Sequence, residues 1–245
     1  MAKAGARSGS TFPRRLPRGR HALAPEEVTR DQRERLLAAV PGVVAERGYE
    51  ATSVADIVKA AAVSRNAFYK NFAGKQDCVA TAHDEGHERL FDVLVMPCGE
   101  VGASIAERVE RSLAAALDAL AREPDLARFL FVEAPSAGKE IALRYHEWLG
   151  RYGTLLRTAA ADKPPQSSPA PEVEGVIVGG IASRIASEVL QGRGEGLRSF
   201  IPSFVDYVLA FYRPSEQGPE GKIVPLEREQ PAAEVPAETQ RKQAS

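Results

Sequence analysis

The 245-residue chain contains few cysteines and almost no net charge, and both facts exclude whole classes of protein. Its two cysteines, Cys78 and Cys98, cannot form a disulfide framework and do not form a Cys-x-x-Cys zinc motif. A net charge of −1 excludes a polycation that binds nucleic acid over its whole surface. The remaining composition, 44% hydrophobic and 27% charged residues, is that of an ordinary globular protein.

Long hydrophobic runs are missing as well. The most apolar stretch, VIVGGIASRIASEVL, is interrupted by Arg184 and Glu188 and is too short to span a bilayer. The N-terminus is basic, but no apolar run follows it, so a secretory signal is not expected. A serine nucleophile elbow, a phosphate loop and a dinucleotide fingerprint are also absent from the sequence. We therefore expect a cytoplasmic protein that is not an enzyme, with no cofactor, no bound metal and no membrane partner.

Positive charge is concentrated at the N-terminus. Residues 1–20 carry six cations and no acidic residue: Lys3, Arg7, Arg14, Arg15, Arg18 and Arg20. A local positive segment on a nearly neutral protein indicates contact with a polyanion, and the alternative is a disordered solubilising tail. We assign residues 1–29 to a flexible basic arm, which either enters a DNA minor groove or stays disordered.

Helical periodicity covers most of the chain, and no convincing strand is present, so the expected fold class is all-α. Pro41 lies inside the first helical segment and predicts a kink there or a helix broken into two parts. Ser53 and Asp56 have the spacing of a capping box at the start of a short second helix, and Ser64 can cap a third. Further helices are expected over 75–94, 103–122, 125–133, 139–162, 172–190 and 195–212, and the tail 213–245 is expected to be disordered.

The stretch VSRNAFYKNFAGKQD, residues 63–77, has aromatic residues and hydrogen-bond donors closely interleaved. Phe68 and Phe72 are four residues apart and share one helix face, which can pack on the preceding helix. The donors lie away from that face, as the recognition helix of a helix-turn-helix requires. Arg65 can make two hydrogen bonds to guanine, Asn66 can make two to adenine, and Tyr69 and Lys70 suit phosphates. The alternative is an ordinary amphipathic helix pair inside a bundle.

The sequence RLLAAVPGVVAERGYEATSVADIVKAAAVSRNAFYKNFAGKQD resembles the DNA-binding domain of the tetracycline-repressor (TetR) family, including its Phe-Tyr-x-x-Phe signature. This resemblance implies a three-helix DNA-binding domain over 30–90 and a helical ligand-binding and dimerisation domain over 91–212. It also implies a homodimer that binds a pseudo-palindromic operator, usually as a repressor, and an unknown small-molecule inducer. The implied DNA-binding residues are Thr52, Ser53, Ser64, Arg65, Asn66, Tyr69, Lys70 and Lys75. Ala62 departs from the family pattern, because glycine is common at that turn position.

The last two predicted helices, 172–190 and 195–212, are the most apolar, and we expect them to form a four-helix dimer interface; burial within one chain is the alternative. A largely apolar ligand is expected among the helices between 103 and 190. Its candidate contacts, each of which can instead be plain core, are Phe129, Phe131, Tyr145, His146, Trp148, Leu149 and Tyr152.

The segment HDEGH places His83 and His87 four residues apart on one helix face, a spacing that can chelate a metal. The glutamate falls one position too late for the metalloprotease motif. We therefore predict a DNA-binding, ligand-responsive regulator. Two alternatives remain: a helical ligand-binding dimer without DNA binding, and a metal-dependent hydrolase that uses this histidine pair.

Overall fold

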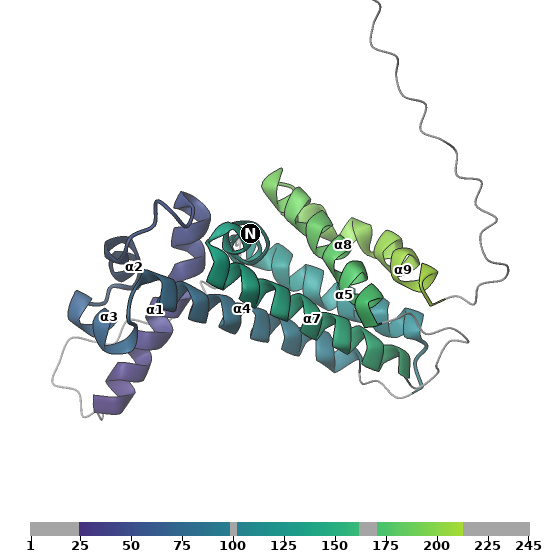
Figure 1. Ribbon diagram of the computed structural model, residues 1–245, viewed down its shortest axis with the longest axis horizontal. Coiled ribbons are helices and arrows are strands. Elements are labelled where there is room, and N and C mark those ends of the chain that lie inside the picture. Colours follow the sequence, from purple (N-terminus) through teal and green to yellow (C-terminus); the bar gives the residue numbers. More distant parts are fainter. Residues whose placement is uncertain (1–24, 99–101, 162–170, 213–245) are drawn as a thin grey trace, which may run out of the picture. The chain divides into compact units, whose positions relative to one another are not determined.

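The computed structural model describes residues 25–98, 102–161 and 171–212, and within these ranges helices are the only regular secondary structure (Figure 1). The all-α fold class is therefore confirmed. The α-helices are α1 (Pro25–Arg47), α2 (Val54–Ala61), α3 (Arg65–Asn71), α4 (Lys75–Cys98), α5 (Ile105–Arg122), α6 (Pro124–Arg128), α7 (Lys139–Ala161), α8 (Pro171–Leu190) and α9 (Ile201–Ala210). A π-helix, η1 (Phe129–Glu133), and two 3-10 helices, η2 (Ala134–Ser136) and η3 (Gly194–Phe200), lie between them. No helix in the described ranges is long and apolar enough to cross a membrane.

The first helix differs from the prediction at its start and at its proline. It begins at Pro25, so residues 25–29, which we had assigned to the basic arm, are helical. It also continues through Pro41 to Arg47, so the predicted break into two helices is wrong. Burial of the side chains on both sides of the proline, such as Leu36, Val40 and Val44, outweighs the cost of about 3 kcal/mol for an internal proline. Residues 1–24 of the arm and the tail 213–245 lie outside the described residues.

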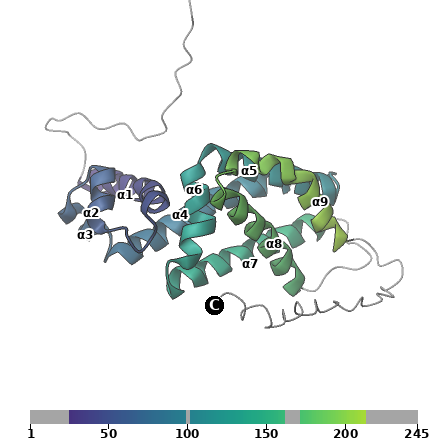
Figure 2. The ribbon, with the colours of Figure 1, turned by 90° about the horizontal axis from the view of Figure 1, so that it is seen from above.

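Helices α2 and α3 are short, and both pack against α1. The predicted capping box begins α2: the Asp56 amide donates to Ser53 Oγ, and the Ser53 amide donates to the Asp56 carboxylate. Their shared core contains Ile57, Phe68 and Leu36, none of which is exposed to solvent. The result is a helix-turn-helix arrangement beside α1 (Figures 1 and 2).

Helix α4 extends four residues beyond the predicted end at Leu94, to Cys98, and includes Pro97 near its C-terminus. The side chains of Cys78, Val79 and Ala82 are buried near its start, and α4 packs on α1 there. Farther along, α4 packs on α5 and α7. One continuous helix therefore leads from the helix-turn-helix to the helices that follow (Figure 2).

Two other predicted helices are each divided in the structure. The predicted helix 125–133 consists of α6 followed by the π-helix η1. The predicted helix 195–212 consists of the 3-10 helix η3 followed by α9, which begins at Ile201 with Pro202 in its first turn. Proline has no amide to donate, so the first turn of a helix, where the amides have no intrahelical acceptor, accommodates it at the least cost.

Candidate nucleic-acid interface and ligand cavity

Helix α3 has one buried face and one exposed face. Ser64 caps its N-terminus by accepting a hydrogen bond at Oγ from the Ala67 amide, 3.1 Å away. Phe68 is 0% exposed and packs 5.7 Å from the Phe72 ring, between centroids. The opposite face carries the predicted DNA-contacting residues, all of them exposed: Ser64, Arg65, Asn66, Tyr69 and Lys70.

The exposed face presents unused donors. Tyr69 is 60% exposed, and its ring lies nearly perpendicular to the Phe68 ring, with centroids 5.3 Å apart. Among the described residues, the side chains of Arg65, Asn66 and Lys70 have no hydrogen-bond or ion-pair partner. Their donors are therefore available to a ligand outside the chain, as contacts with base edges and phosphates require.

The structure corrects the predicted role of Thr52. This residue is buried, its hydroxyl donates to the Gly48 carbonyl at 2.7 Å, and its amide donates to the Tyr49 carbonyl at 3.2 Å. Both of its donors are used to close the turn between α1 and α2, so Thr52 has none left for a phosphate. Ser53, the next residue, is exposed, but its hydroxyl donates to Asp56 at 2.5 Å. This hydrogen bond from Ser53 lowers the pKa of the Asp56 carboxyl.

Lys75 is partly buried at the start of α4. Its Nζ donates to the Tyr49 carbonyl at 2.9 Å and lies 4.2 Å from the centroid of the Tyr49 ring. These two contacts tie the beginning of α4 to the turn between α1 and α2. A phosphate contact by Lys75 stays a prediction, and the side chain has a positioning role in addition.

Sequence reasoning missed Arg35, which supports the helix-turn-helix from α1. Its Nη2 lies 2.5 Å from the Ala61 carbonyl and 2.8 Å from the Ala62 carbonyl, so it satisfies the carbonyls at the end of α2. Its Nη1 lies 3.6 Å from the carboxylate of Asp31. The only sequence pattern that involves Arg35 is its four-residue spacing from Asp31. That spacing predicts a surface ion pair within α1 and not the contact with the end of α2.

Ala62 ends α2 in the left-handed region, with φ 52° and ψ 44°. It is the only non-glycine residue with positive φ in the described ranges, and this conformation costs an L-residue about 1–2 kcal/mol. We expect Ala62→Gly to raise the free energy of unfolding by about 0.5–1 kcal/mol, because the strain relieved exceeds the entropy that glycine adds to the unfolded chain. Urea denaturation measures the change.

Ala60→Gly is the matched control for this prediction, since Ala60 is an exposed residue inside the same helix. There, glycine is expected to lower stability by about 0.5–1 kcal/mol. Equal losses in the two variants would show that the left-handed conformation at Ala62 carries no strain.

An apolar cavity of about 120 Å³ lies among α4, α5, α7, α8 and α9. The residues around it include Leu90, Leu113, Phe131, Leu149, Tyr152 and Ile181. For comparison, an apolar cavity of about 150 Å³ in another protein binds benzene. The cavity described here is slightly smaller than that one. Its apolar lining fits the predicted apolar ligand.

The predicted ligand-binding residues fall into three groups. Leu149, Tyr152 and Phe131 line the cavity. Three other predicted residues are not part of the cavity lining: Phe129, Tyr145 and Trp148. Their rings pack instead around the buried imidazoles of His83 and His87. His146 is exposed on α7, so its prediction as a cavity residue is wrong. The spacing of aromatic residues along a helix does not predict which of their side chains border a cavity and which are packed in the core.

His83 and His87 are both fully buried, with ring centroids 4.5 Å apart. Burial lowers the pKa of His83 and lowers that of His87 well below its usual value, so both imidazoles are neutral at pH 7. In the described part of the chain, no third histidine, cysteine, aspartate or glutamate completes a metal site with them. The hydrolase alternative therefore has only two of the ligands that a catalytic zinc needs.

Residues 36–82, which span the helix-turn-helix and its supporting helices, match the family model described as bacterial regulatory proteins, tetR family. The helix-turn-helix segment therefore matches that of tetR-family regulators, and the match does not extend beyond residue 82. The match lies on the same α1–α4 segment in which Arg65 and Asn66 stand exposed above Phe68. A comparison with curated proteins found no match.

Solved structures of TetR-family regulators share the fold of this chain at low sequence identity. FadR from Bacillus halodurans has a TM-score of 0.65 and 21% identity over 74% of this chain and 99% of its own. FadR from Bacillus subtilis, in complex with stearoyl-CoA, has a TM-score of 0.64 and 17% identity over 73% and 98%. SmeT, the repressor of the Stenotrophomonas maltophilia multidrug efflux pump SmeDEF, has a TM-score of 0.60 and 17% identity over 76% and 94%.

Proposed function

We propose that this protein is a homodimeric transcriptional regulator of the tetR family, a repressor that binds a pseudo-palindromic operator and is released by a small, largely apolar ligand. One observation carries the proposal: α3 buries Phe68 completely while Arg65 and Asn66 stand exposed without partners among the described residues. A recognition helix needs such a division between an anchored face and a face of free donors.

Each exposed side chain of α3 has a role in this proposal. Arg65 and Asn66, in the first turn, read base edges in the major groove, since arginine pairs with guanine and asparagine with adenine. Tyr69 and Lys70 contact phosphates, as does Ser64, whose hydroxyl accepts from the Ala67 amide and keeps its proton to donate. The predicted phosphate contact of Ser53 is given up, because its hydroxyl and its amide both donate to Asp56. The residues 30–90 form the DNA-binding domain, and 91–212 form the domain for ligand binding and dimerisation.

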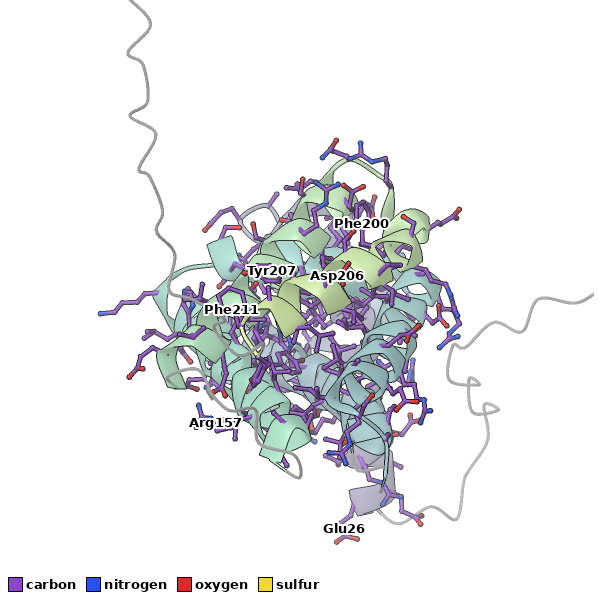
Figure 3. The ribbon with its side chains drawn as sticks, turned by 90° about the vertical axis from the view of Figure 1, so that its right-hand side faces the viewer. Glu26, Arg157, Phe200, Asp206, Tyr207 and Phe211 are labelled. Atoms are coloured by element: carbon purple, nitrogen blue, oxygen red, sulfur yellow. The ribbon has the colours of Figure 1, made fainter. Side chains whose placement is uncertain are left out.

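Apolar side chains exposed on α8 and next to α9 support the dimer. Val176 is 64% exposed and Leu190 is 58% exposed, although both are apolar and lie on helices that are otherwise packed. Figure 3 shows Phe200, Tyr207 and Phe211 along η3 and α9 on the side that faces the viewer. A two-fold interface of α8 and α9 covers these side chains and presents two recognition helices about 34–36 Å apart to successive major grooves.

Helix α4 provides a physical connection between ligand and DNA. Near its start, Lys75 holds the turn before α2 through the Tyr49 carbonyl, and farther along Leu90 and Leu94 line the cavity. A ligand that fills the cavity pushes on these leucines, and a rigid helix transmits the displacement to the helix-turn-helix. The stearoyl-CoA in Bacillus subtilis FadR supports a ligand with a long apolar part.

Selection of bound sequences from a random DNA pool tests the proposal. We expect enrichment of a two-fold symmetric site, with an affinity that falls on a log–log salt plot by about 0.9 per phosphate contact. A pool that stays random after selection would favour the alternative of a ligand-binding dimer that does not recognise DNA.

A further inference from the structure

The two buried imidazoles each have an unused nitrogen. Nε2 of His83 and Nε2 of His87 are buried and have no hydrogen-bond partner in the described part of the chain. A buried polar atom without a partner costs about 1–3 kcal/mol, so two such atoms in adjacent rings are costly to the folded protein. The rings lie 4.5 Å apart between centroids and one turn apart on α4, so the two unused nitrogens belong to neighbouring rings.

The opposite ring nitrogens determine the chemistry of these two atoms. Nδ1 of His83 lies 3.4 Å from the Asp84 carboxylate, which can only accept, so Nδ1 carries the proton. Nδ1 of His87 lies 2.8 Å from the Tyr152 hydroxyl, which itself donates to the His87 carbonyl at 3.3 Å. We assign the hydroxyl proton to the His87 carbonyl, so that the hydroxyl accepts from Nδ1–H and both Nε2 atoms are bare acceptors.

The surroundings favour a donor and disfavour an anion. Aromatic rings lie around the two imidazoles, contributed by Phe129, Phe131, Tyr145, Trp148 and Tyr152. Their faces carry partial negative charge, as do the lone pairs of the two nitrogens. The indole nitrogen of Trp148 donates to Asp84 at 3.1 Å and Arg144 donates to the same carboxylate, so these donors are already engaged.

The histidine pair adjoins the apolar cavity. Phe131 and Tyr152 line the cavity, and the same two rings lie 5.9 Å and 5.8 Å from the His87 ring, between centroids. A ligand in the cavity is thus separated from the pair by one layer of aromatic side chains, so contact with the pair requires the Phe131 or the Tyr152 ring to move aside.

We propose that His83 and His87 form the polar end of the ligand site, and that their Nε2 atoms accept hydrogen bonds from a hydroxyl or ammonium group at one end of a mainly apolar ligand. This inference rests on the proposed function, because it assigns the head group of the ligand that the cavity binds. It excludes a carboxylate as the group in contact with the pair, since a carboxylate has no proton to donate at neutral pH.

An isosteric probe series tests the assignment on the full-length protein by calorimetry. The probes are ethylbenzene, benzyl alcohol, benzylammonium and benzoate, which share a ring and differ in a head group that is apolar, hydroxyl, cationic or anionic. For wild type, we expect benzoate to bind most weakly. In His83→Phe and His87→Phe, which keep a ring but remove the acceptor, the ratio of Kd for benzyl alcohol or benzylammonium to Kd for ethylbenzene is expected to rise by about tenfold.

His146→Phe, on the exposed surface of α7, is the matched control and is expected to leave that ratio unchanged. The hydroxyl and ammonium arms show which donor the pair accepts. If all probes bind and the ratio is the same in every variant, or if benzoate binds most tightly, the histidine assignment is wrong while the ligand cavity stands. If no probe binds, the ligand site of the proposed function fails together with this inference.

Nuclear magnetic resonance of the wild-type protein gives a second test that needs no variant. With ¹⁵N-labelled histidine, the Nε2 resonances of the two buried rings should shift when benzyl alcohol is added, and the resonance of His146 should not. Unmoved Nε2 resonances at saturating benzyl alcohol would overturn the proposal even if His83→Phe and His87→Phe fail to fold.

Discussion

Phe68→Ala is expected to lower the free energy of unfolding by about 3–5 kcal/mol. The ring is 0% exposed and lies between Ile57, Phe72 and the apolar face of α1, so its removal leaves a cavity beneath the recognition helix. Loss of the anchor also frees α3 to move, and operator affinity should fall with stability. Urea denaturation and a DNA-binding titration on the same preparation measure both effects.

Tyr69→Ala is the matched control, because Tyr69 is the next aromatic residue on the same helix and is 60% exposed. It loses only an edge-to-face contact with Phe68, which is worth about 0.5–1.5 kcal/mol. We expect Tyr69→Ala to keep most of the stability while operator affinity falls. If Tyr69→Ala destabilised the protein as much as Phe68→Ala, the division of α3 into a core face and a DNA face would be wrong.

Val176→Arg is expected to convert the dimer to a monomer and to lower operator affinity by about 100-fold or more, since two linked half-sites bind far more tightly than one. Val176 is 64% exposed on α8, so arginine there should not disturb the fold of a single chain. In a two-fold interface, however, each arginine must be desolvated near its symmetry mate. Analytical ultracentrifugation and operator titration measure the two effects.

Leu143→Arg is the control for this variant. Leu143 is also a large apolar side chain on the surface, 53% exposed, but it lies on α7 and outside the proposed interface. We expect Leu143→Arg to remain a dimer with unchanged operator affinity. A Val176→Arg protein that stays dimeric would place the interface elsewhere.

The sequence was most informative where local chemistry determines structure. The Ser53 capping box, the Ser64 cap and the alternation of Phe68 with exposed donors were all predicted, because each depends on residues within one or two helical turns. The departure of Ala62 from the glycine common in the family was noted, and the structure shows that this residue is left-handed, with φ 52°.

The sequence was least informative where distant segments meet. Even a local turn was misread at Thr52: its place at the start of α2 suggested a phosphate donor, but its hydroxyl donates to the Gly48 carbonyl four residues earlier and the side chain is buried. His146 and Tyr152 lie on the same helix, yet one is exposed and the other lines the cavity, since only the packing of α7 against its neighbours distinguishes their faces. The tautomers of the buried histidines depend on partners as far away as Tyr152, which no local pattern reveals.

The central claim is that α3 reads bases with the side chains opposite Phe68, and Arg65→Ala tests it most directly. The measurement compares its affinity for the selected operator with its affinity for random DNA, beside Lys70→Ala as a control cation on the same exposed face. We predict that Arg65→Ala loses about 1–3 kcal/mol on operator and much less on random DNA, whereas Lys70→Ala weakens both alike. Equal losses on operator and random DNA for Arg65→Ala would contradict the claim.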